Sequence, residues 1–162
     1  MTFVVDGTNG LTFNNSTTQA SAGVVLQVVN ANTTTQNIIS TASTSFVTTG
    51  ISVSITPKFS TSKVFVTVNG GASDTQATSQ IAAFTIYRNS TNLGNATVGM
   101  NLTQSAGGRL FTPLSMQVLD SPATTSSTTY TLYICSLNGG SVGLNTGSNP
   151  VFLSITAQEI AQ

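Results

Sequence analysis

The sequence has no histidine, no tryptophan, one cysteine and very few charged residues. Four Lys or Arg and four Asp or Glu give 5% charged residues and a formal net charge of zero. The four cations, Lys58, Lys63, Arg88 and Arg109, are scattered singly along the chain. Nucleic-acid binding requires clustered cations that displace counterions from phosphates. We therefore expect no nucleic-acid partner.

The same shortages exclude most enzyme mechanisms. Without histidine, no imidazole base is available to activate a serine or the single cysteine. The carboxylates Asp6, Asp74, Asp120 and Glu159 lie on widely separated segments, which does not favour the paired acids of a glycosidase. Zinc would require His and Cys clusters, and calcium would require clustered carboxylates. We expect no enzyme activity, no catalytic residue, no cofactor and no metal site.

Neither a disulfide nor a membrane segment is expected. Cys135 is the only cysteine and lies in an apolar-rich run, which is typical of a buried small hydrophobic residue. The N-terminus has no basic segment followed by an apolar stretch, so no signal peptide is expected. No run approaches the roughly 20 apolar residues of a membrane helix. These features predict synthesis in a host cytoplasm and no membrane partner.

What the sequence does have is Ser and Thr, about a third of the chain, set in period-two alternation with apolar residues. Such alternation is typical of strands with one buried and one polar face. About nine or ten short strands are expected, at a spacing typical of an all-β antiparallel β-sandwich or jelly roll. Their expected ranges are 24–29, 37–40, 51–56, 63–69, 81–88, 96–104, 110–119, 130–137, 141–145 and 151–160.

Particular strands carry further expectations. The segment 130–137 has the longest apolar-rich alternation and is expected at the centre of a sheet. Pro113 lacks a backbone donor, so it predicts an edge strand or a bulge near the start of 110–119. Alternation places Thr85 and Tyr87 on an outward face.

The strand that begins at Lys63 combines two apolar phases at its start. The alternation places Val64, Val66 and Val68 on one face and Phe65 and Thr67 on the other. Phe65 belongs to the opposite phase, which indicates that this strand is covered on both faces at its start.

The first 23 residues differ from the rest. We expect a short extended N-terminal arm over 1–23 and a β-sandwich domain over 24–162. Five apolar residues are more than a solvated arm requires, so they either pack on the sandwich or dock on a neighbouring protein. These candidate anchoring residues are Phe3, Val4, Val5, Leu11 and Phe13.

Carbohydrate binding stays open at this stage. Neutral Asn, Ser and Thr side chains can hydrogen-bond to sugar hydroxyls, but sugar sites usually also present exposed aromatic rings and tryptophan is absent. The strand positions of Tyr87, Tyr130 and Tyr133 favour core or subunit packing. Tyr87 and Tyr133 are the candidates for packing between subunits.

Several segments together resemble small bacteriophage virion modules, which occur as tail-fibre knobs and as separate structural proteins. The run Asp-Gly-Thr-Asn-Gly-Leu-Thr-Phe-Asn-Asn-Ser-Thr-Thr-Gln at 6–19 is similar to the segment that often precedes a fibre knob. Stretches similar to the knob itself are Ser-Ile-Thr-Pro-Lys-Phe-Ser-Thr-Ser-Lys-Val at 54–64, Leu-Asp-Ser-Pro-Ala-Thr-Thr at 119–125, Thr-Tyr-Thr-Leu-Tyr at 129–133 and Ala-Gln-Glu-Ile at 157–160.

The resemblance implies a jelly roll of the tumour-necrosis-factor and complement-C1q type, which usually assembles as a threefold homotrimer. Because no stalk precedes the short N-terminal segment, the expectation is a capsid decoration or cement protein on the virion surface, bound through its arm to the major capsid protein. The alternative is a short tail-fibre or receptor-binding knob, joined to tail components and adhering to the host, with glycans among the expected receptors.

Overall fold

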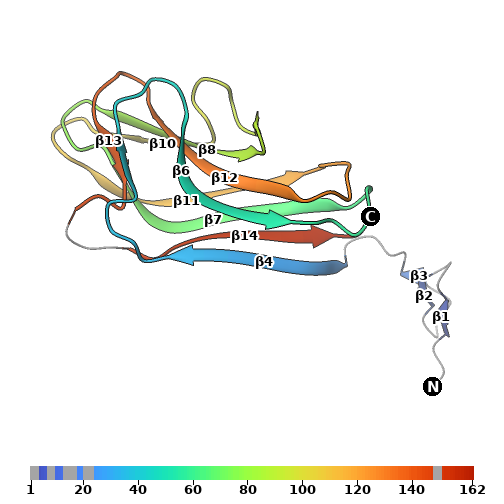
Figure 1. Cartoon of the computed structure of the whole chain (residues 1–162). Helices are drawn as coiled ribbons and strands as arrows, with labels where there is room; N and C mark the ends of the chain where they lie inside the picture. The colour runs from blue at the N-terminus through green and yellow to red at the C-terminus, as the bar shows by residue number, and fades with distance from the viewer. Residues whose placement is uncertain (1–3, 7–9, 13–17, 20–23, 148–150) are drawn as a thin grey trace.

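The computed structural model describes residues 4–6, 10–12, 18–19, 24–147 and 151–162, and Figure 1 shows its strands. Within those ranges the regular structure is entirely β-strand, and none of it is a helix long and apolar enough to cross a membrane. Three short strands precede residue 24 and form a sheet of their own: β1 (Val4–Asp6), β2 (Gly10–Thr12) and β3 (Thr18–Gln19).

The remaining strands form two antiparallel sheets that pack face to face (Figure 1). The first, here called the β7 sheet, contains β4 (Val25–Thr33), β14 (Leu153–Ile160), β7 (Lys63–Asp74) and β11 (Phe111–Asp120). It also contains β13 (Val142–Leu144), which pairs with β7 past the end of its pairing with β14, and β5 (Ile39–Thr41), which pairs with β13. The second, the β12 sheet, contains β6 (Val47–Ile55), β12 (Thr128–Ser136), β8 (Ile81–Arg88), β10 (Asn101–Gln104) and β9 (Thr91–Asn92).

The eight main strands pair in a nested order. In sequence these strands are β4, β6, β7, β8, β10, β11, β12 and β14, and the first pairs with the last: β4 with β14, β6 with β12, β7 with β11, and β8 with β10. Two packed sheets whose strands pair in this nested order form a jelly roll. The prediction of an all-β antiparallel sandwich is therefore confirmed, although β4, β6 and β7 are each longer than the strand expected there.

Two predictions about individual strands are confirmed by the pairing. β12 lies between β6 and β8, which places the expected central strand inside its sheet. β11 pairs with β7 alone and therefore lies at an edge, and its register shifts between Pro113 and Leu114. The missing donor of Pro113 thus lies where a bulge interrupts the ladder.

The prediction of a strand over 96–104 is wrong in its first half, because only Asn101–Gln104 forms β10. The preceding residues form a loop, in which the Asn95 side-chain oxygen accepts hydrogen bonds from the backbone N–H groups of Thr97 and Val98 at 2.9 and 3.0 Å. Such a local side-chain bond offers the backbone an alternative to the ladder. Thr85 faces outward as expected and yet is fully buried, and its nearest neighbours there are Asn92 and Gly94.

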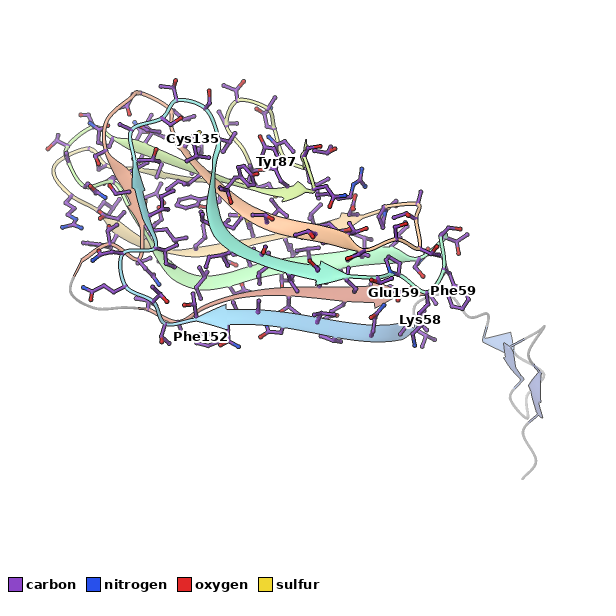
Figure 2. The ribbon with its side chains drawn as sticks, in the orientation of Figure 1. Lys58, Phe59, Tyr87, Cys135, Phe152 and Glu159 are labelled. Atoms are coloured by element: carbon purple, nitrogen blue, oxygen red, sulfur yellow. The ribbon has the colours of Figure 1, made fainter. Side chains whose placement is uncertain are left out.

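The core lies between the sheets and is formed by alternate residues of the strands that face it. Val64, Val66 and Val68 are fully buried, as their phase predicts. The largest buried side chains beside them come from the opposite sheet and include Tyr130, Phe84, Ile86, Leu132 and Ile134. Cys135 is 1% exposed, in agreement with its prediction as a buried hydrophobic residue (Figure 2).

β7 changes partners at a pair of glycines. Gly70 pairs with the first residue of β14, whereas Ser73 pairs with β13. Gly70 has φ +84°, and a Cβ atom there would lie 2.1 Å from the carbonyl oxygen of Phe152. The N–H of Gly71 donates to that same oxygen at 2.7 Å. Only glycine allows this left-handed backbone and this close approach together.

Candidate functional site

The outward side of β4, β14, β7 and β11 carries almost no charge. Register places its side chains in cross-strand rows, because residues directly opposite share a face. One row is apolar except for the side-chain amide of Gln158, and its other members are Val28, Phe65 and Leu119. The next two rows are neutral polar: Asn30, Thr156, Thr67 and Gln117, then Asn32, Ser154, Asn69 and Ser115. We call these three rows the neutral face.

Exposure shows that the neutral face is open. Val28 is 57% exposed and Leu119 51%, while Phe65 between them is half-buried. Lys63, one rung beyond the apolar row, is the single charged side chain of these four strands that is not buried. The expectation that β7 is covered on both faces at its start is therefore met only on its inner face. The apolar phase of Phe65 was the sequence signal behind that expectation.

The two tyrosines singled out from the sequence come together on the outer side of the β12 sheet. The rings of Tyr87 and Tyr133 stack with centroids 3.9 Å apart and an interplanar angle of 24°. Phe46 meets Tyr87 edge-on, with centroids 6.4 Å apart and an angle of 61°. Both tyrosines are half-buried, whereas Tyr130 lies wholly in the core. Packing of Tyr87 and Tyr133 between subunits stays a prediction.

A hollow of about 500 Å³ opens beside this stack. Its walls come from the connection between β5 and β6, from the loop between β9 and β10, and from the end of β12. The lining residues are Thr44, Ser45, Phe46, Tyr87, Ala96, Thr97 and Leu137. We call this the aromatic hollow. Sequence reasoning singled out only Tyr87 of this set. Thr44, Ser45 and Phe46 lie between the expected strands, and the remaining three residues were expected in strands without a site role.

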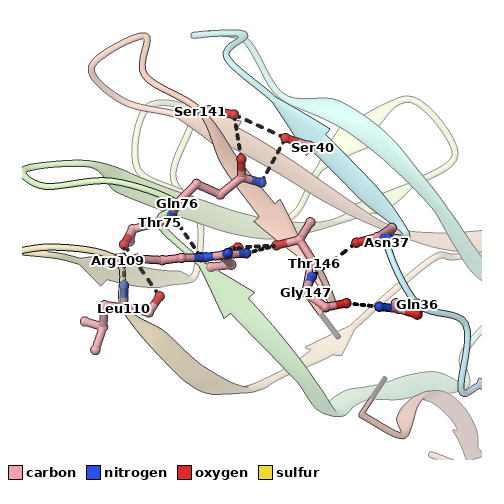
Figure 3. A network of polar contacts seen from close by, with 11 residues as sticks. Gln36, Asn37, Ser40, Thr75, Gln76, Arg109, Leu110, Ser141, Thr146 and Gly147 are labelled. Atoms are coloured by element: carbon pink, nitrogen blue, oxygen red, sulfur yellow. Dashed lines mark hydrogen bonds and ion pairs between the residues drawn. The ribbon is translucent and has the colours of Figure 1, made fainter. Parts of the chain in front are cut away.

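A second, polar pocket of about 430 Å³ contains Arg109 and neutral side chains (Figure 3). Arg109 pairs with the fully buried Asp74, with Nη2 2.5 Å from Oδ2 and Nε 3.0 Å from Oδ1. Burial raises the pKa of Asp74, but hydrogen bonds from Arg109, Thr146 and the backbone of Gln76 outweigh burial and hold that pKa below its ordinary value.

Around this ion pair the polar groups bind one another. Gln76 donates to Ser40 at 2.9 Å and accepts from Ser141 at 2.9 Å, and Gly147 donates to the side chain of Asn37 at 3.1 Å. These bonds connect β5 and the segment before it with the loop that follows β7 and with the residues on either side of β13 (Figure 3). Because the donors and acceptors are already paired, the network holds this end of the sandwich together.

Glu159 is an acid in the otherwise apolar inward phase of β14 and is fully buried. Its carboxylate accepts hydrogen bonds from Gln27 Nε2 at 2.6 Å and from the backbone N–H of Lys58 at 2.7 Å (Figure 2). Burial raises the pKa of Glu159, but these bonds, with a longer one from the Phe59 N–H, outweigh burial and lower that pKa. The carboxylate fixes the turn between β6 and β7.

Asp120 also serves the fold. It ends β11 and accepts hydrogen bonds from Arg88 and Tyr130. Asp74, Asp120 and Glu159 thus each have their own partners. Across the described part of the chain, no group of three His, Cys, Asp or Glu side chains is placed to hold a metal ion.

The candidate anchoring residues of the arm are only partly described. Val5 pairs with Leu11 and Val4 with Thr12 across the β1–β2 ladder. Phe3 and Phe13 lie outside the residues that the structure describes. Among the residues that the structure describes, the arm strands pair with one another and with neither sandwich sheet. Anchoring by these residues stays a prediction.

Comparison with known proteins identifies no family for this chain. No family model matches the chain, and no curated protein matches it. Among solved structures, the chain is similar to one from the structure of the infectious bursal disease virus Gx strain, with 14% sequence identity and a TM-score of 0.29. That match covers 90% of this chain, which spans 39% of the length of its neighbour.

Proposed function

We propose that this chain is a non-enzymatic structural protein of a bacteriophage virion surface, that it assembles as a homotrimer, and that it decorates the capsid. The observation that carries the proposal is the neutral face, an open sheet surface with an apolar row and a single flanking cation. Open apolar rows on a sheet favour burial against another protein. The virion setting rests on the resemblance of the sequence segments to phage surface modules.

Magnitudes support self-association through this face. Association costs about 4–15 kcal/mol, which apolar burial at about 25 cal/mol per Å² offsets with roughly 160–600 Å². Four strands of eight residues cover roughly 500 Å², so three such faces that meet around a threefold axis bury about 1,500 Å² in total. Ion pairs contribute little, because Lys63 is the only charge available there. The amide and hydroxyl rows can hydrogen-bond to those of the neighbouring subunits.

The arm supports decoration of the capsid. Val4, Val5 and Leu11 belong to a small sheet that is separate from the sandwich sheets in strand pairing. In the proposed mechanism the trimer forms a button on the capsid, and its arms bind the major capsid protein and bridge neighbouring subunits against internal pressure. The work is mechanical, and no residue is assigned to catalysis.

A second candidate function is a short tail-fibre or receptor-binding knob joined to tail components. The aromatic hollow favours it, because a concave site with aromatic and hydroxyl groups suits adhesion to a host surface. Copy number separates the two. Quantitative mass spectrometry of purified particles should find hundreds of copies of a decoration protein, and a few tens or fewer of a tail fibre.

The assembly itself is tested on the purified full chain. Sedimentation velocity should give three times the 16.6 kDa chain mass at micromolar concentration. A monomer under those conditions would contradict the trimer. Deleting residues 1–20 should leave a folded trimer that no longer joins particles lacking the wild-type chain. Full incorporation of the deleted form would contradict anchoring by the arm.

A further inference from the structure

We propose that the aromatic hollow binds a neutral saccharide. The inference concerns the outer side of the β12 sheet and stands apart from the proposed assembly through the β7 sheet. It applies equally to a capsid button and to a fibre knob.

Charge sets the class of ligand. None of the residues lining the aromatic hollow carries a charge. Arg88 follows Tyr87 in β8 but is engaged with Asp120 at 2.8 Å. A charged ligand would lose hydration without gaining a counter-charge, which is costly. A neutral ligand does not meet this cost, so sialic acids, uronic acids and phosphorylated groups are disfavoured.

Hydroxyl groups supply the polar contacts. Within the described residues, the side-chain oxygens of Thr44, Ser45, Thr97 and Tyr87 have no hydrogen-bond partner, although all four residues line the hollow. Each hydroxyl can donate one hydrogen bond and accept others. Sugar hydroxyls have the same dual capacity, so they are matched to such a set.

Aromatic carbon supplies the apolar contacts. Phe46 and Tyr87 line the hollow from different strands and connections, and Tyr133 supports Tyr87 from behind in the stack. The face of an aromatic ring is electron-rich and attracts the weakly positive C–H groups of a sugar ring. An apolar patch beside free hydroxyls therefore suits a molecule that has one C–H face and a polar rim.

The two loops that form the walls are held in place before any ligand binds. Asn95 and Gly99 exchange backbone hydrogen bonds at 2.9 and 3.1 Å, which closes the loop that carries Thr97. In the facing connection, the Ser43 hydroxyl donates to the backbone carbonyl of Ser45 at 2.7 Å. A site ordered in advance loses less conformational entropy on binding. The polar pocket around Arg109 is less suited, because its groups already bind one another.

The test uses the full wild-type chain and saturation-transfer-difference NMR. The neutral probes are the methyl glycosides of glucose, galactose, mannose, rhamnose and N-acetylglucosamine at millimolar concentration, and N-acetylneuraminic acid is the charged probe. Tyrosine fluorescence provides a second measurement, because the chain contains no tryptophan. At least one neutral probe should bind saturably, with transfer to its ring C–H protons, while the charged probe should not.

Two variants and one control connect binding to the hollow. Tyr87→Ala should weaken binding by about tenfold or more, because the aromatic contact is lost. Thr97→Val keeps the shape of an exposed side chain and should weaken binding about fivefold through one lost hydrogen bond. Tyr133→Phe retains the stack and removes a hydroxyl that does not line the hollow, so binding should be unchanged.

Several outcomes would overturn the proposal. These are no saturable binding of any neutral probe, stronger binding of the charged probe, or equal affinity in wild type and Thr97→Val. The same preparations report on assembly by sedimentation. A trimer that binds no sugar therefore refutes this site alone, and a monomer that binds sugar refutes the assembly alone.

Discussion

Tyr130 donates its phenolic hydrogen to Asp120 over 2.7 Å, and Arg88 donates to the same carboxylate at 2.8 Å. Tyr130 lies on β12 and Arg88 on β8, whereas Asp120 ends β11 in the facing sheet. The carboxylate therefore connects the two layers of the sandwich. Burial raises the pKa of Tyr130, and the bond to Asp120 raises it further, so the phenol keeps its hydrogen.

Removing that phenol should cost stability. Tyr130→Phe is expected to lower the free energy of unfolding by about 1.5–3 kcal/mol, the range for a hydrogen bond to a charged group. Urea denaturation followed by circular dichroism measures the change. The matched control is Tyr133→Phe, whose phenol has no partner among the described residues and should change stability by less than about 0.5 kcal/mol. Equal effects would show that the Asp120 contact is not stabilising.

Acid should destabilise the fold below about pH 4.5. The pKa values of Asp74 and Glu159 are held below their ordinary values of 3.8 and 4.5 in the folded chain. A depressed carboxyl pKa contributes stability above the unfolded value, and that stability is lost as the pH falls through the folded value. Denaturant midpoints between pH 7 and pH 2 measure the loss.

The same titration has a control in Glu159→Gln. This variant should be less stable at neutral pH but should lose less stability in acid, because one of the two titrating carboxyls is gone. Without histidine, wild-type stability should stay nearly flat between about pH 5.5 and 7. A steep change within that interval would contradict the assignment of the acid transition to Asp74 and Glu159.

The glycine pair in β7 predicts a sharp contrast. Gly70→Ala should destabilise the fold by about 2–4 kcal/mol, because a new Cβ would meet the Phe152 carbonyl and the backbone φ is positive. Gly107→Ala is the control, since nothing lies within 4 Å of the added carbon. It should be neutral within about 0.5 kcal/mol. Thermal melts of both variants test this, and similar midpoints would contradict the role of Gly70.

The neutral face makes a prediction about assembly. Leu119→Glu places a charge in the apolar row and should convert the proposed trimer to monomers, because a buried unpaired charge is costly. Leu102 on β10 has the same 51% exposure but lies in the other sheet, so Leu102→Glu should leave the assembly unchanged. Light scattering after gel filtration distinguishes these outcomes. Monomers from Leu102→Glu alone would move the interface to the β12 sheet.

Much of the fold follows from period-two alternation. The pattern located the central strand β12, and the missing donor of Pro113 located an edge and a bulge. Two features did not follow from local pattern. Residues 96–100 contain strand-forming side chains, but the Asn95 side chain and Gly99 turn them into a loop. Glu159 can lie on the inward face of β14 because backbone N–H groups of the β6–β7 turn, which is distant in the sequence, donate hydrogen bonds to its carboxylate.

Less of the candidate site was predictable. The stack of Tyr87 and Tyr133 requires knowing that β8 and β12 are neighbours, and the same register makes Thr131 the direct partner of Tyr87. The outward phase of Phe65 indicated a strand that is covered on both faces. Its row with Val28 and Leu119 depends on three strands whose pairing no local signal specifies. Long-range register decides both surfaces.

The nested strand order has a consequence for biosynthesis. β14 occupies the gap between β4 and β7, so the β7 sheet stays open until the last of its strands is present. Partners separated by more than a hundred residues make folding slow, because long loops must close first. The sandwich therefore cannot close on the ribosome until residue 160 has emerged. Until then the unpaired edges of β4 and β7 are open to chaperones or to wrong neighbours.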